Sequence, residues 1–433
     1  MEILILATCF LLLLALGVPI SWSIGLSSTC TLLVSMPAGP ALTTVAQRMA
    51  TGLDSFSLLA IPFFILAGEL MNRGGIARRL VAFAKSVVGA LPGGLAHVNI
   101  VAAMLFGAIA GSAVAAVSAL GGMLGTEMEK DGYPREFSAA VNITAGTTGL
   151  VIPPSNILIV YSLASGGVSI ATLFLAGYLP GLLVGGLLML TAGLWAHHRK
   201  FPAGPRSSLR QIVRTFVDAF PSLLLLVVVI GGIVAGIFTA TEASAVAVLY
   251  CLVLTLLYRE ISFVALPSVF LRAAATTSVV LLLVGTSMGL SWVMAYENIP
   301  QAISEALLSV SQDKVVVLLL INLLLLFVGI FMDITPAVLI FTPIFLPVVT
   351  QLGMDPAHFG IVMVVNLCIG LCTPPVGSVL FVGVGVGRTT IRAVLRPLLP
   401  LFLAMLAALL LITFVPAVSL WLPQTVGDWF GSR

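Results

Sequence analysis

The chain of 433 residues is 60% hydrophobic and only 8% charged, with a net charge of +3 and a mean hydropathy of +1.20. Because about a quarter of the residues in soluble domains are charged, this composition excludes a soluble globular protein and indicates an all-α polytopic membrane protein. The small positive charge is scattered among loops, so it bears on membrane topology rather than on nucleic-acid binding.

The chain is expected to begin with three spans, two within 3–36 and a third at 56–71. Between them, Arg48 and Asp54 mark a short polar connection. Four basic residues follow within 73–85, and the positive-inside rule places this loop in the cytoplasm. Counting back three spans then places the N-terminus in the periplasm.

A long stretch without Asp, Glu, Lys or Arg, 86–126, follows this loop. As one helix it would be about 60 Å long, whereas the hydrocarbon core of a bilayer is about 30 Å thick. Gly111 and Ser112 lie in its middle, so we predict a re-entrant helical hairpin over about 90–126. After two more spans comes a basic cytoplasmic linker, 197–220.

Two Pro-Pro pairs, Pro153-Pro154 and Pro374-Pro375, interrupt apolar segments. Proline removes a backbone N–H and clashes with the preceding turn, so the helices at about 137–165 and about 358–387 are expected to break there. In hydrocarbon the exposed backbone groups are tolerated only where protein or a watery cavity surrounds them. The two breaks therefore predict the interior site of a transporter.

The two Pro-Pro pairs are separated by 221 residues, and the same spacing carries Ser112 onto Asp333, in the turn of a second predicted hairpin at about 315–350. We therefore interpret the chain as two repeats of one unit, 1–196 and 221–433, joined by the linker. Counting spans gives the repeats opposite orientations and leaves the C-terminus in the periplasm. This inverted-topology repeat, with two re-entrant hairpins and two broken helices, is the plan of secondary transporters.

Asp333 is the acid that this topology places deep in the membrane, where an uncompensated carboxylate costs at least about 2.5 kcal/mol. No Lys or Arg is expected at that depth, which leaves Na+ or helix N-terminal N–H groups to compensate its charge. Asp333 could also simply cap the second arm of its hairpin, and the two roles are compatible.

Broken helices offer backbone carbonyls to Na+, and Ser and Thr add hydroxyl oxygens. We predict about two or more co-transported Na+ ions, with one site at each hairpin tip. The expected ligands of the first are Ser112, Thr147, Thr148 and Gly149, and those of the second are Asp333, Thr335, Gly370 and Thr373. The expected substrate contacts are Ser112, Ser155, Asn156, Asp333 and Ser378, although the residues that follow the Pro-Pro pairs could equally be local helix caps.

A transported carboxylate would meet no buried Arg in this arrangement. It would have to rest on N–H groups at the tips and on the field of bound Na+, which favours an anionic substrate taken up with sodium. Cys368 and Cys372 stand four residues apart, but no His or carboxylate with ligand spacing accompanies them, which argues against a transition-metal site.

Three long segments resemble the large membrane subunit of TRAP transporters, the tripartite ATP-independent periplasmic carriers. They are 61–75 (IPFFILAGELMNRGG), 149–161 (GLVIPPSNILIVY) and 236–250 (GIFTATEASAVAVLY), in the same order as in the family. The likeness covers nearly the whole chain.

The resemblance implies a Na+-driven, elevator-type carrier in a bacterial inner membrane. Its implied partners are a small four-helix membrane subunit, here a separate polypeptide, and a soluble periplasmic substrate-binding protein. Typical substrates of the family are C4-dicarboxylates, sialic acids and related organic acids. The family also has Na+ and substrate sites at the hairpin tips and broken helices, which here match Ser112, Ser155 and Asp333.

Three alternatives remain. The nearest is a stand-alone Na+/dicarboxylate symporter that needs no binding protein. A channel is disfavoured by paired hairpins that close from opposite faces. A membrane enzyme is disfavoured because intramembrane aspartyl proteolysis needs two carboxylates, of which only Asp333 is expected, and because no G-x-x-x-x-G-K-[ST] run of a P-loop ATPase occurs.

Overall fold

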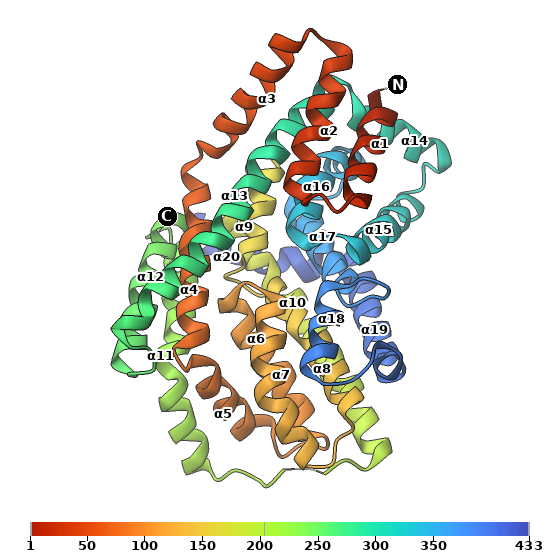
Figure 1. Ribbon diagram of the computed structural model, residues 1–433. Helices are drawn as coiled ribbons and strands as arrows, with labels where there is room; N and C mark the ends of the chain where they lie inside the picture. Colours follow the sequence, from red (N-terminus) through yellow and green to blue (C-terminus); the bar gives the residue numbers. More distant parts are fainter. Residues whose placement is uncertain (1, 203, 432–433) are drawn as a thin grey trace.

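The computed structural model describes residues 2–202 and 204–431, which form helices and connecting loops without a strand (Figure 1). Within these residues, eight helices are long and apolar enough to cross a membrane. The bent pair α8 (Arg135–Val151) and α9 (Asn156–Ala164) adds a ninth candidate. The expectation of an all-α polytopic membrane protein is confirmed.

In the part of the chain that the structure describes, four α-helices, rather than the three expected spans alone, precede the first basic loop. The elements before the first basic loop are α1 (Glu2–Ala15), α2 (Ile20–Ser35), α3 (Ala38–Leu53), the 3-10 turn η1 (Phe56–Leu59) and α4 (Ala60–Arg73). The short polar connection expected around Arg48 and Asp54 is therefore wrong, since most of it is the 16-residue helix α3. This helix is amphipathic and packs along α13 (Leu266–Tyr296), so apolar content alone did not reveal it.

A peripheral helix and a helical pair follow. Helix α5 (Ile76–Val88) leads into α6 (Gly94–Ala110) and α7 (Ala113–Lys130), which pack against each other and against α8. Helix α9 and the long helix α10 (Ile170–Arg199) complete the first half. The turn of the helical pair falls at Gly111-Ser112, as the sequence predicts.

The second half contains the remaining elements: α11 (Leu209–Val234), α12 (Ala240–Leu257), η2 (Phe263–Ala265), α13, α14 (Ile299–Val310), α15 (Lys314–Phe331), α16 (Ile334–Gln351), α17 (Pro356–Gly370), α18 (Ser378–Val386), α19 (Ile391–Phe414) and α20 (Ala417–Gly431). Two expected boundaries change. The linker predicted at 197–220 is helical at both ends, because α10 ends at Arg199 and α11 begins at Leu209. The last span ends before Pro416, and α20 is a separate helix that packs on α10.

Both Pro-Pro pairs interrupt their helices. Helix α8 ends at Val151 and α9 begins at Asn156 with a bend of 52° between them. Helix α17 ends at Gly370, and α18 begins only at Ser378. Both Pro-Pro peptide bonds are cis.

The two halves repeat an order of elements: a helical pair, then a helix that breaks. The pair α6–α7 lies in the lower half of Figure 1 and the pair α15–α16 in its upper half. In each unit the first helix of the pair touches the broken helix through glycines, Gly107 on Gly149 and Gly329 on Gly370. A Cβ on Gly107 would lie 2.7 Å from the Cα of Gly149, and a Cβ on Gly370 would lie 2.5 Å from the Cα of Gly329.

Where α8 packs on α17, equivalent positions of the two units meet. The Cys368 Sγ–H donates to the Thr147 carbonyl at 3.5 Å, and these residues are separated by the same 221 positions as the Pro-Pro pairs.

The repeat boundaries expected from the sequence, 1–196 and 221–433, stay a prediction.

The glycine contacts give a test of packing. Gly370→Ala would force its Cβ against the Gly329 backbone, which cannot rotate away as a side chain could. We expect a loss of about 1–3 kcal/mol of stability, seen as a lower Tm of the purified protein in detergent.

The matched control is Gly186→Ala on α10, where a Cβ has no neighbour within 4 Å. It should keep or slightly raise the Tm, because alanine favours helix more than glycine does. Equal Tm values for the two variants would show that the close approach of the two glycines does not matter.

Candidate functional site

A cavity of about 250 Å³ lies between both helical pairs, the broken helices and the helices α4 and α13. Its walls include the turns at Gly111-Ser112 and Asp333, which are 221 residues apart in sequence. The structure therefore brings the two predicted tips to one site.

The first tip is built around a glycine. Gly111 ends α6 with φ +61°, a conformation that glycine adopts without strain. Ser112 then caps α7, its Oγ accepting a hydrogen bond from the Ala115 N–H at 3.3 Å. Asn156, the first residue of α9, packs so closely that a Cβ on Gly111 would lie 2.6 Å from its Nδ2. The tip thus rests on the start of the second half of the broken helix.

The second tip carries a charge. Asp333 caps α16, and its Oδ1 accepts a hydrogen bond from the Ile334 N–H at 2.9 Å. The capping role expected for Asp333 is therefore present, yet the side chain is exposed and lines the cavity together with Thr335. A capping carboxylate open to the cavity keeps oxygen lone pairs available for a ligand.

Helix ends of both kinds meet at this cavity. Residues from the first turns of α7, α9, α16 and α18 line it, and so do Leu150 at the end of α8 and Leu371 at the end of α17. Helix N-termini present N–H groups and favour anions, whereas C-termini present unpaired carbonyls and favour cations. The same cavity can therefore receive both.

Of the residues predicted to form the site, four line the cavity and seven do not. The lining residues are Ser112, Asn156, Asp333 and Thr335. The residues that do not line it are Thr147, Thr148, Gly149, Ser155, Gly370, Thr373 and Ser378.

Four hydroxyls among these seven residues are engaged locally. Ser155 Oγ donates to the Leu150 carbonyl at 2.5 Å, Thr148 Oγ1 to Ala145 at 2.6 Å, and Thr147 Oγ1 to Thr144 at 2.9 Å. Thr373 Oγ1 donates to Ile369 at 2.8 Å, while Ser378 is exposed outside the cavity. Such hydrogen bonds from Ser and Thr side chains to a preceding backbone carbonyl are common in helices.

Sequence reasoning missed three polar residues of the cavity: Glu69 and Asn72 on α4, and Thr276 on α13. The expectation of Asp333 as the single acid at the site is thus wrong. Glu69 lies within a candidate span, Phe56–Arg73, and this acid in an apolar helix was the available signal. The lining contains Glu69 and Asp333 but no Lys, Arg or His.

Comparison with known sequences identifies the family. Residues 7–418 match the family described as "Tripartite ATP-independent periplasmic transporter, DctM component". The chain belongs to this TRAP transporter family. It is therefore a multi-pass membrane transport protein and not an enzyme.

Three relatives of this TRAP permease match over nearly their whole length. The chain is 56% identical to "Uncharacterized protein YgiK" of Salmonella typhimurium, over 98% of this chain and 97% of that protein. It is 40% identical to the C4-dicarboxylate TRAP transporter large permease protein DctM of Rhodobacter capsulatus, over 99% and 100%. It is 38% identical to the sialic acid TRAP transporter large permease protein SiaM of Vibrio cholerae, over 95% and 96%.

Among solved structures, the YdaH transporter of Alcanivorax borkumensis resembles this TRAP permease with a TM-score of 0.64 at 16% identity. The similarity covers 90% of this chain and 88% of that one. It shows a shared fold.

Cavity and wall can be told apart by chemical labelling. Thr335→Cys should react quickly with a water-soluble thiol reagent, because residue 335 lines the cavity, and Ser155→Cys should react far more slowly, because residue 155 is buried. The unmodified protein, with its five native cysteines, gives the background. Similar rates for the two variants would argue against this cavity.

Proposed function

We propose that this permease takes up an organic acid anion together with Na+ across a bacterial inner membrane. The observation that carries the proposal is the meeting of four helix N-termini and two helix C-terminal ends at one cavity that Asp333 and Glu69 make negative. Because no Lys or Arg lines this cavity, an anion there needs cations from solution to offset the two carboxylates.

The Na+ ions of this proposal sit at the tips. The first would be held by Ser112 and the broken end of α8 at Thr147, Thr148 and Gly149. The second would be held by Asp333, Thr335 and the broken end of α17 at Gly370 and Thr373. The threonine hydroxyls of α8 and α17 already bond within their helices, and the Thr147 carbonyl accepts from Cys368 Sγ–H. In this proposal these bonds rearrange when Na+ binds, and the oxygens they release become its ligands.

The substrate of this proposal is a small carboxylate. Relatives named for C4-dicarboxylates and for sialic acid share this chemistry, and a cavity of about 250 Å³ suits a small molecule. Ser112 and Asn156 contact it, with Ser155 and Ser378 close to the helix starts that receive its carboxylate. Asp333 acts on it through the bound Na+.

The glycine contacts support a proposal for alternating access. Each helical pair contacts its broken helix through glycines, whereas α4 and α13 line the cavity without belonging to either pair or either broken helix. In this proposal the pairs and broken helices therefore form one body. We propose an elevator movement of that body along α4 and α13, with the two units as inverted repeats and their tips as re-entrant hairpins.

The partners and topology of this proposal follow the family. A small four-helix membrane subunit supports the permease, and a periplasmic binding protein delivers the substrate. The basic loops lie in the cytoplasm and both termini in the periplasm, in accord with the clusters at 73–85, 199–214 and 388–396.

The first experiment measures uptake of labelled carboxylic acids into proteoliposomes that hold the permease with its partner proteins. We expect uptake of at least one acid to require an inward Na+ gradient. Asp333→Ala should abolish that uptake while the protein still folds, because the second Na+ loses its only charged ligand.

Asp313→Ala is the matched control, since Asp313 caps α15 as Asp333 caps α16 but is exposed away from the cavity. It removes a helix cap and should leave uptake nearly normal. Wild-type uptake by Asp333→Ala would remove Asp333 from the mechanism, and equal loss in both variants would reduce its role to capping.

The alternative is a stand-alone Na+/dicarboxylate symporter. Uptake by the same vesicles with and without the periplasmic binding protein separates the two. We expect uptake only when the binding protein is present. Full uptake by the permease alone would favour the stand-alone symporter.

A further inference from the structure

Glu69 is the second acid of the cavity, and it comes from a different part of the molecule than Asp333. Asp333 lies on the tip between α15 and α16, whereas Glu69 lies on α4, which packs mainly along α12 and α13. Under the proposed movement, Asp333 travels with the substrate and Glu69 stays behind. The substrate must therefore pass a fixed carboxylate.

The nearest basic residue does not neutralise Glu69. Arg73 follows it by four positions on the same helix, which is the favoured arrangement for a Glu–Arg ion pair. Instead, Arg73 Nη1 donates to Ser268 Oγ at 2.9 Å. Glu69 is half-buried and has no hydrogen bond or ion pair with any residue that the structure describes.

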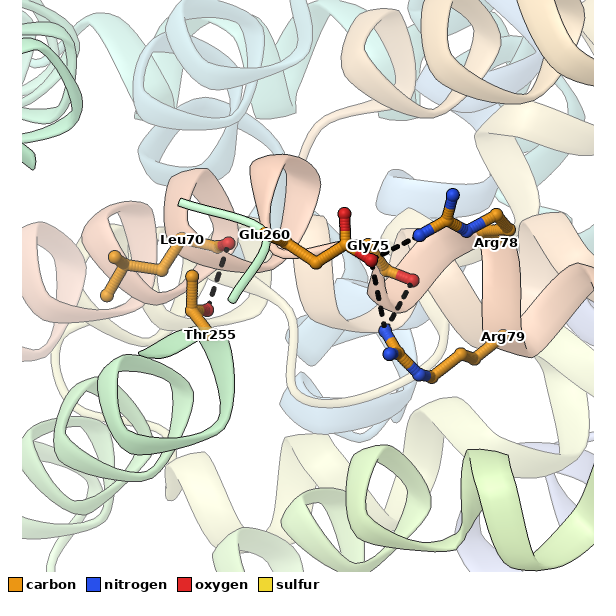
Figure 2. A network of polar contacts seen from close by, with 6 residues as sticks. All are labelled: Leu70, Gly75, Arg78, Arg79, Thr255 and Glu260. Carbon is orange, nitrogen blue, oxygen red and sulfur yellow. Dashed lines mark hydrogen bonds and ion pairs between the residues drawn. The ribbon is translucent and has the colours of Figure 1, made fainter. Parts of the chain in front are cut away.

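The other arginines of this loop are also engaged elsewhere. Figure 2 shows Arg78 paired with Glu260 in the α12–α13 connection, and Arg79 beside the same carboxylate at 3.9 Å. Arg79 also donates to the Gly75 carbonyl at 3.2 Å. Its guanidinium lies 3.6 Å from the centre of the Tyr258 ring. Arg78 and Arg79 of the loop thus place their positive charge at Glu260. The negative charge of Glu69 stays unpaired among the described residues and faces the cavity.

We propose that Glu69 is a coupling residue, which selects for substrate that carries its Na+ ions. The inference rests on the proposed function. An anion alone would face two carboxylates, Asp333 and Glu69, in a partly enclosed site where charge repulsion is stronger than in water. An anion accompanied by enough Na+ has no net negative charge, so Glu69 does not oppose it. Glu69 therefore suppresses movement of the anion without sodium.

Glu69→Gln tests this with little change in shape. The measured quantity is the fraction of uptake without sodium, that is, the sodium-free rate divided by the sodium-driven rate. Removing the charge should raise this fraction roughly fivefold, because charge repulsion in a partly hydrated site is of that size. Glu69→Asp keeps the charge and should restore the wild-type fraction. A purely structural role would lower both rates together and leave the fraction unchanged.

The experiment uses the proteoliposomes described above and whichever acid of the panel the wild-type protein transports. Each variant is assayed with an inward Na+ gradient and in sodium-free choline medium. Glu305→Gln is the control, because Glu305 is an exposed acid of α14 that lies outside the cavity. It should match the wild type.

Three results would overturn the inference. The first is an unchanged fraction in Glu69→Gln. The second is loss of all uptake by a folded Glu69→Gln protein. The third is a Glu69→Asp protein with the same raised sodium-free uptake as Glu69→Gln. Sodium-independent uptake by the wild type, or no uptake of any acid, would instead reject the proposed function itself. The two failures are therefore distinguishable.

Discussion

Backbone groups that lose their helical partners must find others, and in a membrane protein this constraint shapes everything around the cavity. Two Pro-Pro pairs end α8 and α17, and two tips end α6 and α15. The structure gathers these ends at one place, where Ser112 and Asp333 cap the helices that restart. Unpaired backbone groups at isolated helix ends would cost free energy in hydrocarbon. Brought together, the same groups form one polar site.

Glycine makes that gathering possible. Gly107 lies on Gly149, and Gly329 lies on Gly370, so each helical pair approaches its broken helix at backbone distance. A side chain at any of these positions would push the tip away from the break. In each half the contact joins the first helix of the pair to the helix that breaks.

Much of this arrangement could be predicted from the sequence. Proline chemistry located both breaks, because it is a local backbone rule. The length of the uncharged stretch 86–126 located the tip at Ser112, and the spacing of 221 residues carried it to Asp333. The amphipathic helix α3 and the polar wall of the cavity were not found. Glu69 faces the tips only because α4 folds back beside them, and such long-range placement leaves no mark in local periodicity. Likewise, the burial of Thr147 and Ser155 depends on tertiary packing around the broken helix.

The side chains break the symmetry that the backbone suggests. One tip offers a neutral hydroxyl and the other a carboxylate. Farther along, Asn366 Nδ2 donates to Asn322 Oδ1 at 2.8 Å and joins α15 to α17 directly. In the first unit, Asn99 and Asn142 instead line a separate cavity of about 120 Å³, and their Oδ1 atoms have no hydrogen-bond partner among the described residues. Gly383 and Arg388 of the second half line that cavity too, and Asn366 Oδ1 likewise has no hydrogen-bond partner among the described residues. The two halves thus repeat an order of elements while their polar side chains differ.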